Sequence, residues 1–423
     1  MQRLIIKGKI GLNGKISISG SKNATLPILA ATILSNKTIL KNIPLVKDIF
    51  TMVELLNFIG LKIRINKNKN IIQTHNKEKN INTLAPYKLV KTMRAGVLVL
   101  GSLLTKYRKA KVSLPGGCAI GTRPVDLHLF ALKKLGAKIK IKDGYIHAEA
   151  KKGLIGNTIN FPSISVGATE NALLAASKAQ GKTVLKNCAI EPEIKDLIIF
   201  LKKMGTTIHL KGRTITIKKS KIENSKIEHN VIFDRIELGT YMIACALQAK
   251  GNITINKIDP RIVKNEIDTL KKIGVKITVK KTSVIIQKNN KLKRINIITK
   301  PYPGFPTDLQ AQLMVLLTQA KGTSKIREDI FENRFMHVPE LKRMGARIEI
   351  KDKTAIITGP TKLTGAEVMA TDLRASVSLV LAGLVADNRT IINRIYHLDR
   401  GYEHLENKLK KCKAKIKRVQ NGA

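Results

Sequence analysis

One pattern of apolar and polar positions returns along the chain about every 70 residues. In each copy a segment with helical periodicity ends at a glycine, and alternating apolar and polar residues follow it. Leu132–Ile141 (Leu-Lys-Lys-Leu-Gly-Ala-Lys-Ile-Lys-Ile) and Leu270–Val279 are clear examples. A degenerate sixth copy, Leu409–Ile416, has Lys413 at the position of the glycine. The glycines of the other five copies, 69 to 76 residues apart, are Gly60, Gly136, Gly205, Gly274 and Gly345.

Each copy predicts a helix followed by a half-buried strand. Basic residues in a last turn and a glycine after it favour a helix that ends in a left-handed cap. Strict alternation predicts a strand with one buried face. Self-similarity at a fixed period indicates one supersecondary repeat, present six times. Because 423 residues exceed what one hydrophobic core usually supports, we expect two α/β domains of three repeats each.

A second, more apolar helix followed by a short strand is expected in the repeats. These segments are apolar on nearly all sides, so they should lie in domain cores. Six such repeats argue against a simple Rossmann sheet, and no GxGxxG sequence follows a predicted strand. The expected core helices are Ala24–Leu34, Ala168–Ala179, Leu238–Ala249, Leu309–Ala320 and Leu373–Ala386, with a further one at Arg94.

Composition excludes several classes of protein. The longest apolar runs, such as Ser378–Ala386, fall far short of the roughly 20 residues of a membrane span. The N-terminal apolar block is too small for a secretory signal. The four cysteines are scattered, with no CxxC pair and no zinc-ligand spacing. We therefore expect a cytoplasmic protein with free thiols, no membrane partner, no metal and no cofactor.

The formal net charge of +47 would attract nucleic acid or another anionic surface. However, the lysines are spread through every segment, aromatic residues make up only 4%, and no stacking platform is evident. Abundant lysine, isoleucine and asparagine fit a compositional bias equally well. We expect a solvated basic surface and no specific nucleic-acid partner.

The starts of the core helices are candidate anion sites. Ser, Thr and Asp at these positions are ordinary N-caps. Helix N-termini also bind anions, so several of them directed at one place would suit a polyanionic ligand. The segments concerned are Ser19–Asn23, Lys91–Ala95, Ser165–Gly167, Asp234–Glu237, Pro306–Asp308 and Thr371–Arg374.

A glycine-rich loop holds the second candidate feature. In Leu114–Leu127, glycines at 116, 117 and 121 surround Cys118, and Arg123 follows five residues later. The glycines let a ligand approach the backbone. The loop alone fits either a buried thiol in a tight turn or a reactive cysteine.

Together these segments resemble the UDP-N-acetylglucosamine enolpyruvyl transferases, in order and over essentially the whole chain. The resemblance rests on Gly20–Ala24, Leu114–Cys118, Gly121, Arg123–Leu127, Phe305–Asp308, Glu332–His337, Ala370–Arg374 and Asp399–Glu403. It implies two inside-out α/β barrels of three repeats, residues 22–232 and residues 1–21 plus 233–423, with the active site in the cleft between them. It also implies transfer of the enolpyruvyl group of phosphoenolpyruvate to the 3-hydroxyl of UDP-N-acetylglucosamine, the first committed step of peptidoglycan synthesis, by a monomer.

The resemblance also assigns roles. Cys118 matches the general acid on a closing lid, Asp308 the base, and Lys22, Arg123 and Arg400 the groups around the phosphate. Arg334 and Arg374 match groups around the carboxylate. The rival interpretation of Asp308 is an N-cap for the helix that follows it. The nucleotide-sugar contacts that the resemblance implies are Asn23, Arg94, Arg123, Pro124, Val125, Asp126, Leu127, Ser165, Val166, Gly167, Asp308 and Ile330. Lys22, Ser163, Arg334 and Arg374 complete the expected substrate-binding residues.

Two positions depart from the family pattern. Ser163 stands where a related sequence has lysine, which predicts weaker nucleotide binding there. Lys413 replaces the usual glycine and should affect only a helix cap. Two alternatives stay open: a shikimate-type enolpyruvyl transferase, against which the Pro-Gly-Gly-Cys loop and Arg123–Leu127 argue, and a basic nucleic-acid-binding repeat protein.

Overall fold

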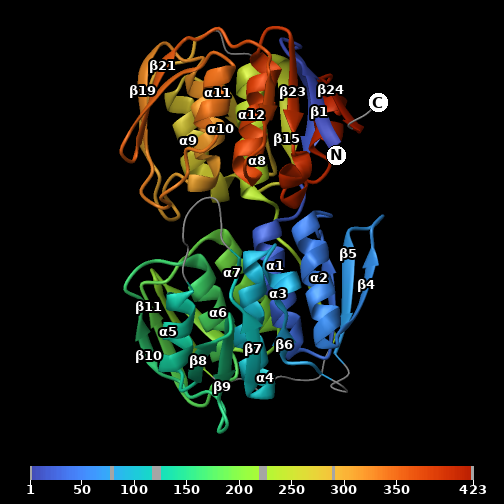
Figure 1. The fold of residues 1–423 in the computed structure, drawn as a ribbon, viewed down its shortest axis with the longest axis vertical. Helices are drawn as coiled ribbons and strands as arrows, with labels where there is room; N and C mark the ends of the chain where they lie inside the picture. The colour runs from blue at the N-terminus through green and yellow to red at the C-terminus, as the bar shows by residue number, and fades with distance from the viewer. Residues whose placement is uncertain (1, 77–80, 117–124, 219–225, 288–290, 421–423) are drawn as a thin grey trace. The chain divides into compact units, whose positions relative to one another are not determined.

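The computed structural model describes residues 2–76, 81–116, 125–218, 226–287 and 291–420. They form two compact lobes. The N-terminal lobe comprises the described residues from Gly20 to Ile232. The C-terminal lobe comprises those before Gly20 and after Ile232. Each lobe is described by itself below (Figure 1).

Three four-stranded sheets in each lobe share one strand order. The first two strands are parallel, and the third and fourth are antiparallel additions. In the N-terminal lobe the sheets are β10 (Thr158–Asn160), β11 (Lys182–Lys186), β13 (Thr214–Lys218) and β12 (Thr207–Lys211); β6 (Leu84–Ala85), β7 (Lys109–Ser113), β9 (Tyr145–Glu149) and β8 (Lys138–Lys142); and β14 (Lys226–Asn230), β3 (Lys37–Lys41), β5 (Ile71–His75) and β4 (Lys62–Asn66).

The C-terminal lobe repeats this order with strands from both ends of the chain. Its β1 pairs with β24 and β23, and its β2 pairs with β15, so the N-terminal segment completes two sheets. The sheets are β22 (Glu367–Met369), β23 (Arg389–Asn393), β1 (Gln2–Lys7) and β24 (Lys415–Gln420); β18 (Asn296–Ile298), β19 (Gly322–Arg327), β21 (Thr354–Gly359) and β20 (Arg347–Lys351); and β2 (Leu12–Ser17), β15 (Ala249–Asn256), β17 (Ser283–Ile286) and β16 (Ile277–Val279). The predicted six repeats are confirmed.

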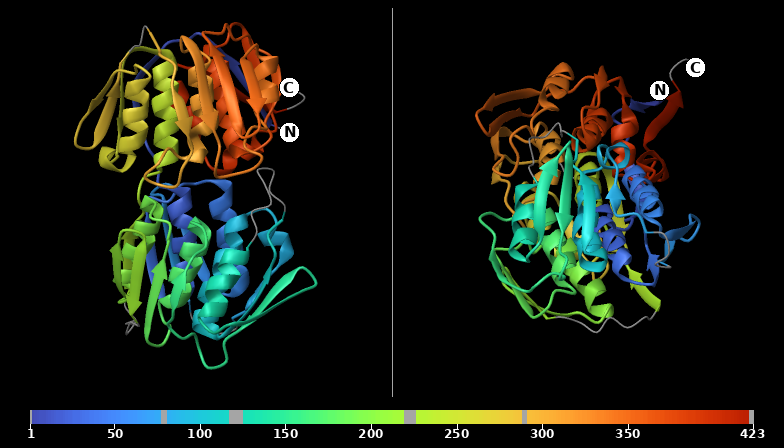
Figure 2. Two further views of the ribbon diagram at one scale, coloured as in Figure 1. Left: turned by 90° about the vertical axis from the view of Figure 1, so that its left-hand side faces the viewer. Right: turned by 60° about the horizontal axis from the view of Figure 1, so that its bottom comes forward.

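The apolar helices form the centre of each lobe, as their sequences predict. In the N-terminal lobe α1 (Lys22–Ala31), α4 (Val99–Tyr107) and α6 (Val166–Ala176) contact one another. In the C-terminal lobe the same holds for α8 (Arg235–Gln248), α10 (Gln310–Leu317) and α12 (Leu373–Val385). All eight residues of α10 are buried. The sheets lie outside these helices in both lobes (Figures 1 and 2).

The amphipathic helices end as the repeat predicts. After five of them the repeat glycine has a positive φ, from 92° at Gly136 and Gly205 to 118° at Gly60. In the sixth, Lys413 adopts a φ of 71° without being glycine. These helices are α2 (Lys47–Ile59), α5 (Asp126–Lys134), α7 (Pro192–Lys203), α9 (Lys264–Lys272), α11 (Val338–Arg343) and α13 (Leu405–Lys411); a short α3 covers Tyr87–Val90. Among the described helices, none combines the length and apolar character that a bilayer crossing needs.

Candidate active site

The loop with the candidate acid is only partly described. Leu114, Pro115 and Gly116 follow β7, and Val125 resumes the chain before α5. Cys118, Arg123 and Pro124 lie outside the described residues, so their predicted roles stay predictions.

Asp308 in the C-terminal lobe lies between two arginines. It belongs to the 3₁₀ turn Thr307–Leu309, which precedes α10. Nη2 of Arg374 lies 2.9 Å from one carboxylate oxygen, and Arg334 pairs with the other. Both guanidinium groups are buried. The predicted grouping of Asp308, Arg334 and Arg374 is therefore present in this lobe.

This grouping decides the charge on Asp308. Burial acts to raise the pKa of Asp308, but Arg374 and Arg334 outweigh it and hold the pKa well below its usual range. Asp308 in turn raises the pKa of Arg374 against the effect of burial. Paired in this way, Asp308 is fully ionised and a weak proton acceptor.

The rival interpretation of Asp308 as an N-cap is wrong for this structure. Its side chain makes no capping hydrogen bond to the 3₁₀ turn or to α10, both of which are described throughout. By contrast, Asp372 caps α12 by accepting from the backbone N–H groups of Arg374 and Ala375, at 2.7 and 3.1 Å. This cap fixes the first turn of α12, from which Arg374 extends to Asp308.

A buried acid that the sequence did not single out organises the same region. Glu328, after β19, accepts hydrogen bonds from the backbone N–H groups of Ile330 and Phe331, at 2.9 and 3.1 Å. Its other oxygen accepts from the Thr307 hydroxyl at 2.8 Å. Glu328 thus connects the turn that contains Ile330, a predicted substrate contact, to Thr307, the residue before Asp308. A charged residue directly after an alternating strand was the only signal for it.

His337 immediately precedes α11 and interacts electrostatically with Arg334 and Asp372. It is buried, and burial lowers its pKa to about 4, with the positive charge of Arg334 acting in the same direction and Asp372 opposing. The imidazole is therefore neutral at neutral pH. No protein atom among the described residues bonds its Nε2.

Arg400 occupies a separate turn of the C-terminal lobe. It ends the 3₁₀ turn Ile395–Arg400, which packs on α12. The next residue, Gly401, is close enough to α12 that an added Cβ would lie 2.7 Å from a Leu373 side-chain carbon. The turn is therefore held against the helix that carries Arg374.

In the N-terminal lobe, Lys22 forms a buried ion pair with Asp48. The distance from its Nζ to Oδ2 of Asp48 is 3.0 Å. Ser21 caps α1 by accepting from the backbone of Ala24 at 3.3 Å, so Lys22 is the first helical residue. Asp48 lies at the start of α2 and was not predicted as part of the site.

Close backbone packing places the start of α1. A Cβ at Gly20 would lie 1.7 Å from the Asn42 carbonyl oxygen, so only glycine fits there. The predicted contact Asn23 is half-buried in the first turn of the helix.

The other predicted nucleotide-sugar contacts of this lobe lie at two further helix starts. Arg94 opens the 3₁₀ turn Arg94–Leu98, which leads into α4 and contacts both α1 and α6. Ser165 caps α6, so Val166 and Gly167 form its first turn, and Ser163 lies exposed two residues earlier. The structure therefore brings Lys22, Arg94 and Ser165–Gly167 to one end of the three central helices.

Asp126 and Leu127 lie in the first turn of α5, which packs on α6. The two helices are joined by a 3.1 Å hydrogen bond between Nδ1 of His128 and the amide of Asn171. A Cβ at Gly167 would lie 3.0 Å from the His128 ring. Because of this close packing, Val125, Asp126 and Leu127 lie next to the start of α6.

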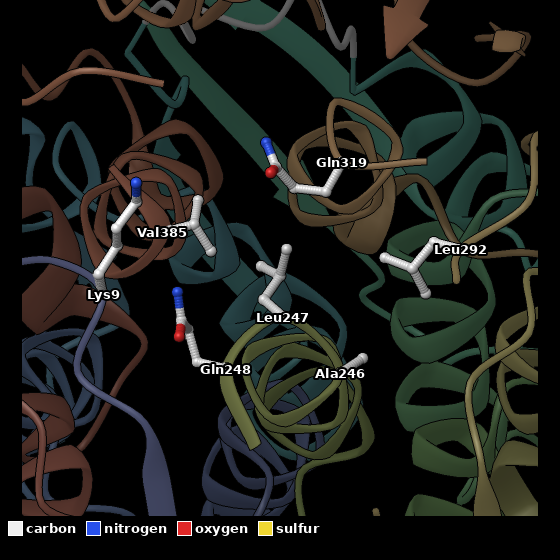
Figure 3. Close-up of a pocket in the computed structure, with 7 residues that line it drawn as sticks. All are labelled: Lys9, Ala246, Leu247, Gln248, Leu292, Gln319 and Val385. Atoms are coloured by element: carbon white, nitrogen blue, oxygen red, sulfur yellow. The ribbon is translucent and has the colours of Figure 1, made fainter. Parts of the chain in front are cut away.

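A pocket of about 280 Å³ in the C-terminal lobe lies at the C-terminal ends of that lobe's own central helices (Figure 3). Its lining includes Gln248 and Gln319, at or beyond the C-terminal ends of α8 and α10, together with Lys9. Helix C-termini present carbonyl oxygens and partial negative charge, so this end is unsuited to an anionic substrate. Among the described residues no His, Cys, Asp and Glu cluster could hold a metal ion.

Sequence comparison gives close relatives over nearly the whole chain. The family profile "EPSP synthase (3-phosphoshikimate 1-carboxyvinyltransferase)" matches residues 6–409. A UDP-N-acetylglucosamine 1-carboxyvinyltransferase of Pelagibacter ubique (strain HTCC1062) is 60% identical over 421 residues, covering 99% of this chain and all of the relative. The proteins of the same name from Rickettsia prowazekii (strain Madrid E) and Rickettsia africae (strain ESF-5) are 52% and 51% identical, with the same coverage.

Structure comparison gives the same fold. The enolpyruvyl transferase NikO from Streptomyces tendae superposes with a TM-score of 0.90 at 24% identity, covering 99% of both chains. An EPSP synthase from Acinetobacter baumannii superposes with a TM-score of 0.76 at 17% identity, covering 99% of this chain and all of the other. At these identities the likeness shows the fold alone.

Proposed function

Because the chain belongs to the UDP-N-acetylglucosamine 1-carboxyvinyltransferase family, we propose that Cys118, Asp308, Lys22 and Arg400 carry out its chemistry. The chain is a transferase that moves the enolpyruvyl group of phosphoenolpyruvate to UDP-N-acetylglucosamine, a step of peptidoglycan synthesis. The relatives, 51–60% identical over their full length, favour this acceptor over 3-phosphoshikimate. The proposal concerns which residues perform the reaction and how.

The reaction proceeds by addition and elimination. Protonation of C3 of phosphoenolpyruvate develops positive charge at C2, and the sugar 3-hydroxyl adds there with loss of its proton. Elimination then removes a proton from C3 and releases phosphate. Cys118 is the general acid at C3, because a thiol with an ordinary pKa of about 8.5 transfers protons in both directions near neutral pH. The loop that carries it acts as a lid that excludes water from the reacting carbons.

Asp308 is the base for the 3-hydroxyl. Its pairing with Arg334 and Arg374 controls how strongly it accepts a proton. While the two arginines pair with Asp308, they hold its pKa too low for efficient proton transfer. The carboxylate of phosphoenolpyruvate competes for Arg374 and Arg334, since a guanidinium fork binds carboxylates in a bidentate manner. When they turn to the substrate, the pKa of Asp308 rises towards its ordinary value. The base is thus released when its substrate is present.

The remaining charged residues hold the anionic groups. Lys22, Arg123 and Arg400 bind the phosphate and stabilise the charge that develops on it. Asp48 holds Lys22 in one position, which limits the entropy lost on binding. The nucleotide sugar binds at the starts of the central helices, where backbone N–H groups and the helix dipole favour its diphosphate. Its contacts are Asn23, Arg94, residues 123–127, Ser163, Ser165, Val166, Gly167 and Ile330.

We assign this enzyme to the cytoplasm, as a monomer with domains 22–232 and 1–21 plus 233–423. The described cysteines Cys188, Cys245 and Cys412 are buried and form no disulfide, which suits a reducing compartment. Substrates alone are the proposed partners. The basic surface has no specific nucleic-acid role.

Phosphate release tests the assignment. The purified chain is given phosphoenolpyruvate with either UDP-N-acetylglucosamine or 3-phosphoshikimate, and release should require the sugar nucleotide. Cys118→Ala should abolish release at neutral pH while nucleotide binding persists. Cys118→Asp should retain activity with a lower pH optimum, because a carboxyl group also delivers a proton. Full activity of Cys118→Ala would remove the thiol from the mechanism, and nucleic-acid binding that survives rising salt would favour the competing function.

A further inference from the structure

One buried hydroxyl joins all three central helices of the C-terminal lobe. The Tyr402 side chain is only 3% exposed, and its oxygen lies 3.2 Å from Nη1 of Arg374 on α12. The same oxygen lies 2.9 Å from the Thr240 hydroxyl on α8 and 3.3 Å from Nε2 of Gln312 on α10. Each central helix therefore contributes one polar side chain to this phenol.

The hydrogen atoms of this network can be assigned. Thr240 donates its own hydrogen to the Ile236 carbonyl at 2.8 Å, so the Thr240 oxygen is left to accept. Tyr402 donates to it, and the phenolic oxygen accepts from Nη1 of Arg374 and from Nε2 of Gln312, which also lies 3.1 Å from the Thr240 oxygen. Burial raises the pKa of Tyr402, so the phenol keeps the proton it donates.

The network reaches the candidate base from two sides. Nε2 of Gln312 also donates to the backbone carbonyl of Asp308 at 2.9 Å. Arg374 uses Nη1 for Tyr402 and Nη2 for the Asp308 carboxylate. Its guanidinium carbon lies 5.7 Å from the Tyr402 ring centroid, within the range of a cation–π contact. Tyr402 follows Arg400 by two residues, and its backbone N–H bonds the Leu398 carbonyl of the same turn at 3.0 Å.

We propose that Tyr402 is a positioning residue that fixes Arg374 and Asp308 relative to each other and anchors the turn bearing Arg400. It holds one side of the Arg374 guanidinium, so that only the Nη2 side exchanges between Asp308 and the substrate carboxylate. This inference rests on the proposed function for its kinetic consequence. The tethering itself depends only on the hydrogen bonds of the Tyr402 hydroxyl.

Tyr402→Phe tests the kinetic consequence, because it removes the acceptor and keeps the ring. We expect kcat to fall about 10-fold or more, while KM for UDP-N-acetylglucosamine stays within twofold. Tyr241→Phe is the matched control, since Tyr241 is equally buried in the same lobe and its hydroxyl has no hydrogen-bond partner among the described residues. It should keep kcat within twofold of the wild type. A wild-type kcat in Tyr402→Phe, or an equal loss in Tyr241→Phe, would overturn the proposal.

A spectroscopic measurement tests the tether without turnover. In the intact ¹⁵N-arginine-labelled protein, slow rotation of a held guanidinium should resolve the Nη signals of Arg374, which Arg374→Lys identifies by their loss. Tyr402→Phe should merge them, and Tyr241→Phe should not. Resolved signals in Tyr402→Phe would refute the tether. A wild-type chain that releases no phosphate would refute the proposed function alone, because the spectrum is still readable.

Thr240 provides a second variant if Tyr402→Phe folds poorly. Thr240→Val removes the acceptor of the phenolic hydrogen and should reproduce part of both effects. Thr240→Ser keeps the hydroxyl and should restore wild-type behaviour. Equal behaviour of the valine and serine variants would contradict the proposed role of the hydroxyl.

Discussion

The guanidinium of Arg374 lies 2.9 Å from the carboxylate of Asp308, although 66 residues separate them in the chain. Arg334 pairs with the other oxygen of the same carboxylate. The charge of the candidate base is therefore balanced by the groups proposed to bind the substrate carboxylate. The same contact keeps the buried charges compensated and holds Asp308 in its weakly basic form.

Replacing Arg374 should change the pH dependence of the reaction. In Arg374→Gln the pKa of Asp308 should rise towards its ordinary range, because the largest of the positive charges that lower it is lost. The acid limb of kcat/KM should then move to higher pH, and kcat should fall by about 100-fold as transition-state charge loses a partner. Steady-state kinetics between pH 4 and 8 measure both effects. Arg261→Gln, at an exposed pair with Asp259, is the control and should match the wild type.

Alkylation should distinguish Cys118 from the other thiols. Cys188, Cys245 and Cys412 are buried, and burial raises the pKa of each, that of Cys188 to about 12. Thiolate is the reactive form, so an epoxide analogue of phosphoenolpyruvate should label Cys118 alone. Peptide mapping by mass spectrometry gives the site. Labelling of Cys188 or Cys245 in the folded protein would contradict the assignment.

His337 should make the fold sensitive to acid. Its pKa is about 4 in the folded chain and about 6.5 when unfolded, so the unfolded state binds the proton more tightly. The neutral ring contributes its stability above pH 6.5 and loses it as the pH falls through 4. Over this range the unfolding free energy should drop by about 3 kcal/mol more than in His337→Gln. Denaturant titrations at several pH values test the difference; parallel curves for the two proteins would refute it.

Asp48 should matter for stability through Lys22. Asp48→Ala leaves a buried ammonium group without its carboxylate and should cost about 3 kcal/mol of unfolding free energy. Adding Lys22→Met removes that charge and should recover most of the loss. Chemical denaturation of the two single variants and the double variant measures the coupling. Additive losses would mean that the pair contributes no mutual stabilisation.

Lys413→Gly should stabilise the chain. Lys413 has a φ of 71°, a conformation that costs a residue with a Cβ roughly 1 kcal/mol. Glycine removes this cost, so the unfolding free energy should rise by about 1 kcal/mol. Gly136→Ala is the reverse experiment, because φ is 92° there and nothing lies within 4 Å of the added Cβ. It should lower the unfolding free energy by a similar amount. A less stable Lys413→Gly together with a more stable Gly136→Ala would refute the argument.

The sequence determined the repeat, its helices and strands, and the residues at the helix starts. These features depend on local periodicity and capping, which neighbouring residues specify. The left-handed conformation after five of the six amphipathic helices was likewise predictable from the glycines, whereas Lys413 after the sixth adopts it without one. The family resemblance supplied Asp308, Arg334 and Arg374 as site residues.

Only the tertiary structure decided which side chains meet. Asp48 reaches Lys22, Glu328 reaches Thr307, and Tyr402 reaches three helices, in each case across 21 to 162 residues of chain. Such pairings depend on how the central helices pack. The spacing of the repeats and the short motifs do not specify that packing. The same packing lowers the pKa of Asp308, because the effect requires arginines from distant segments beside one partly buried carboxylate.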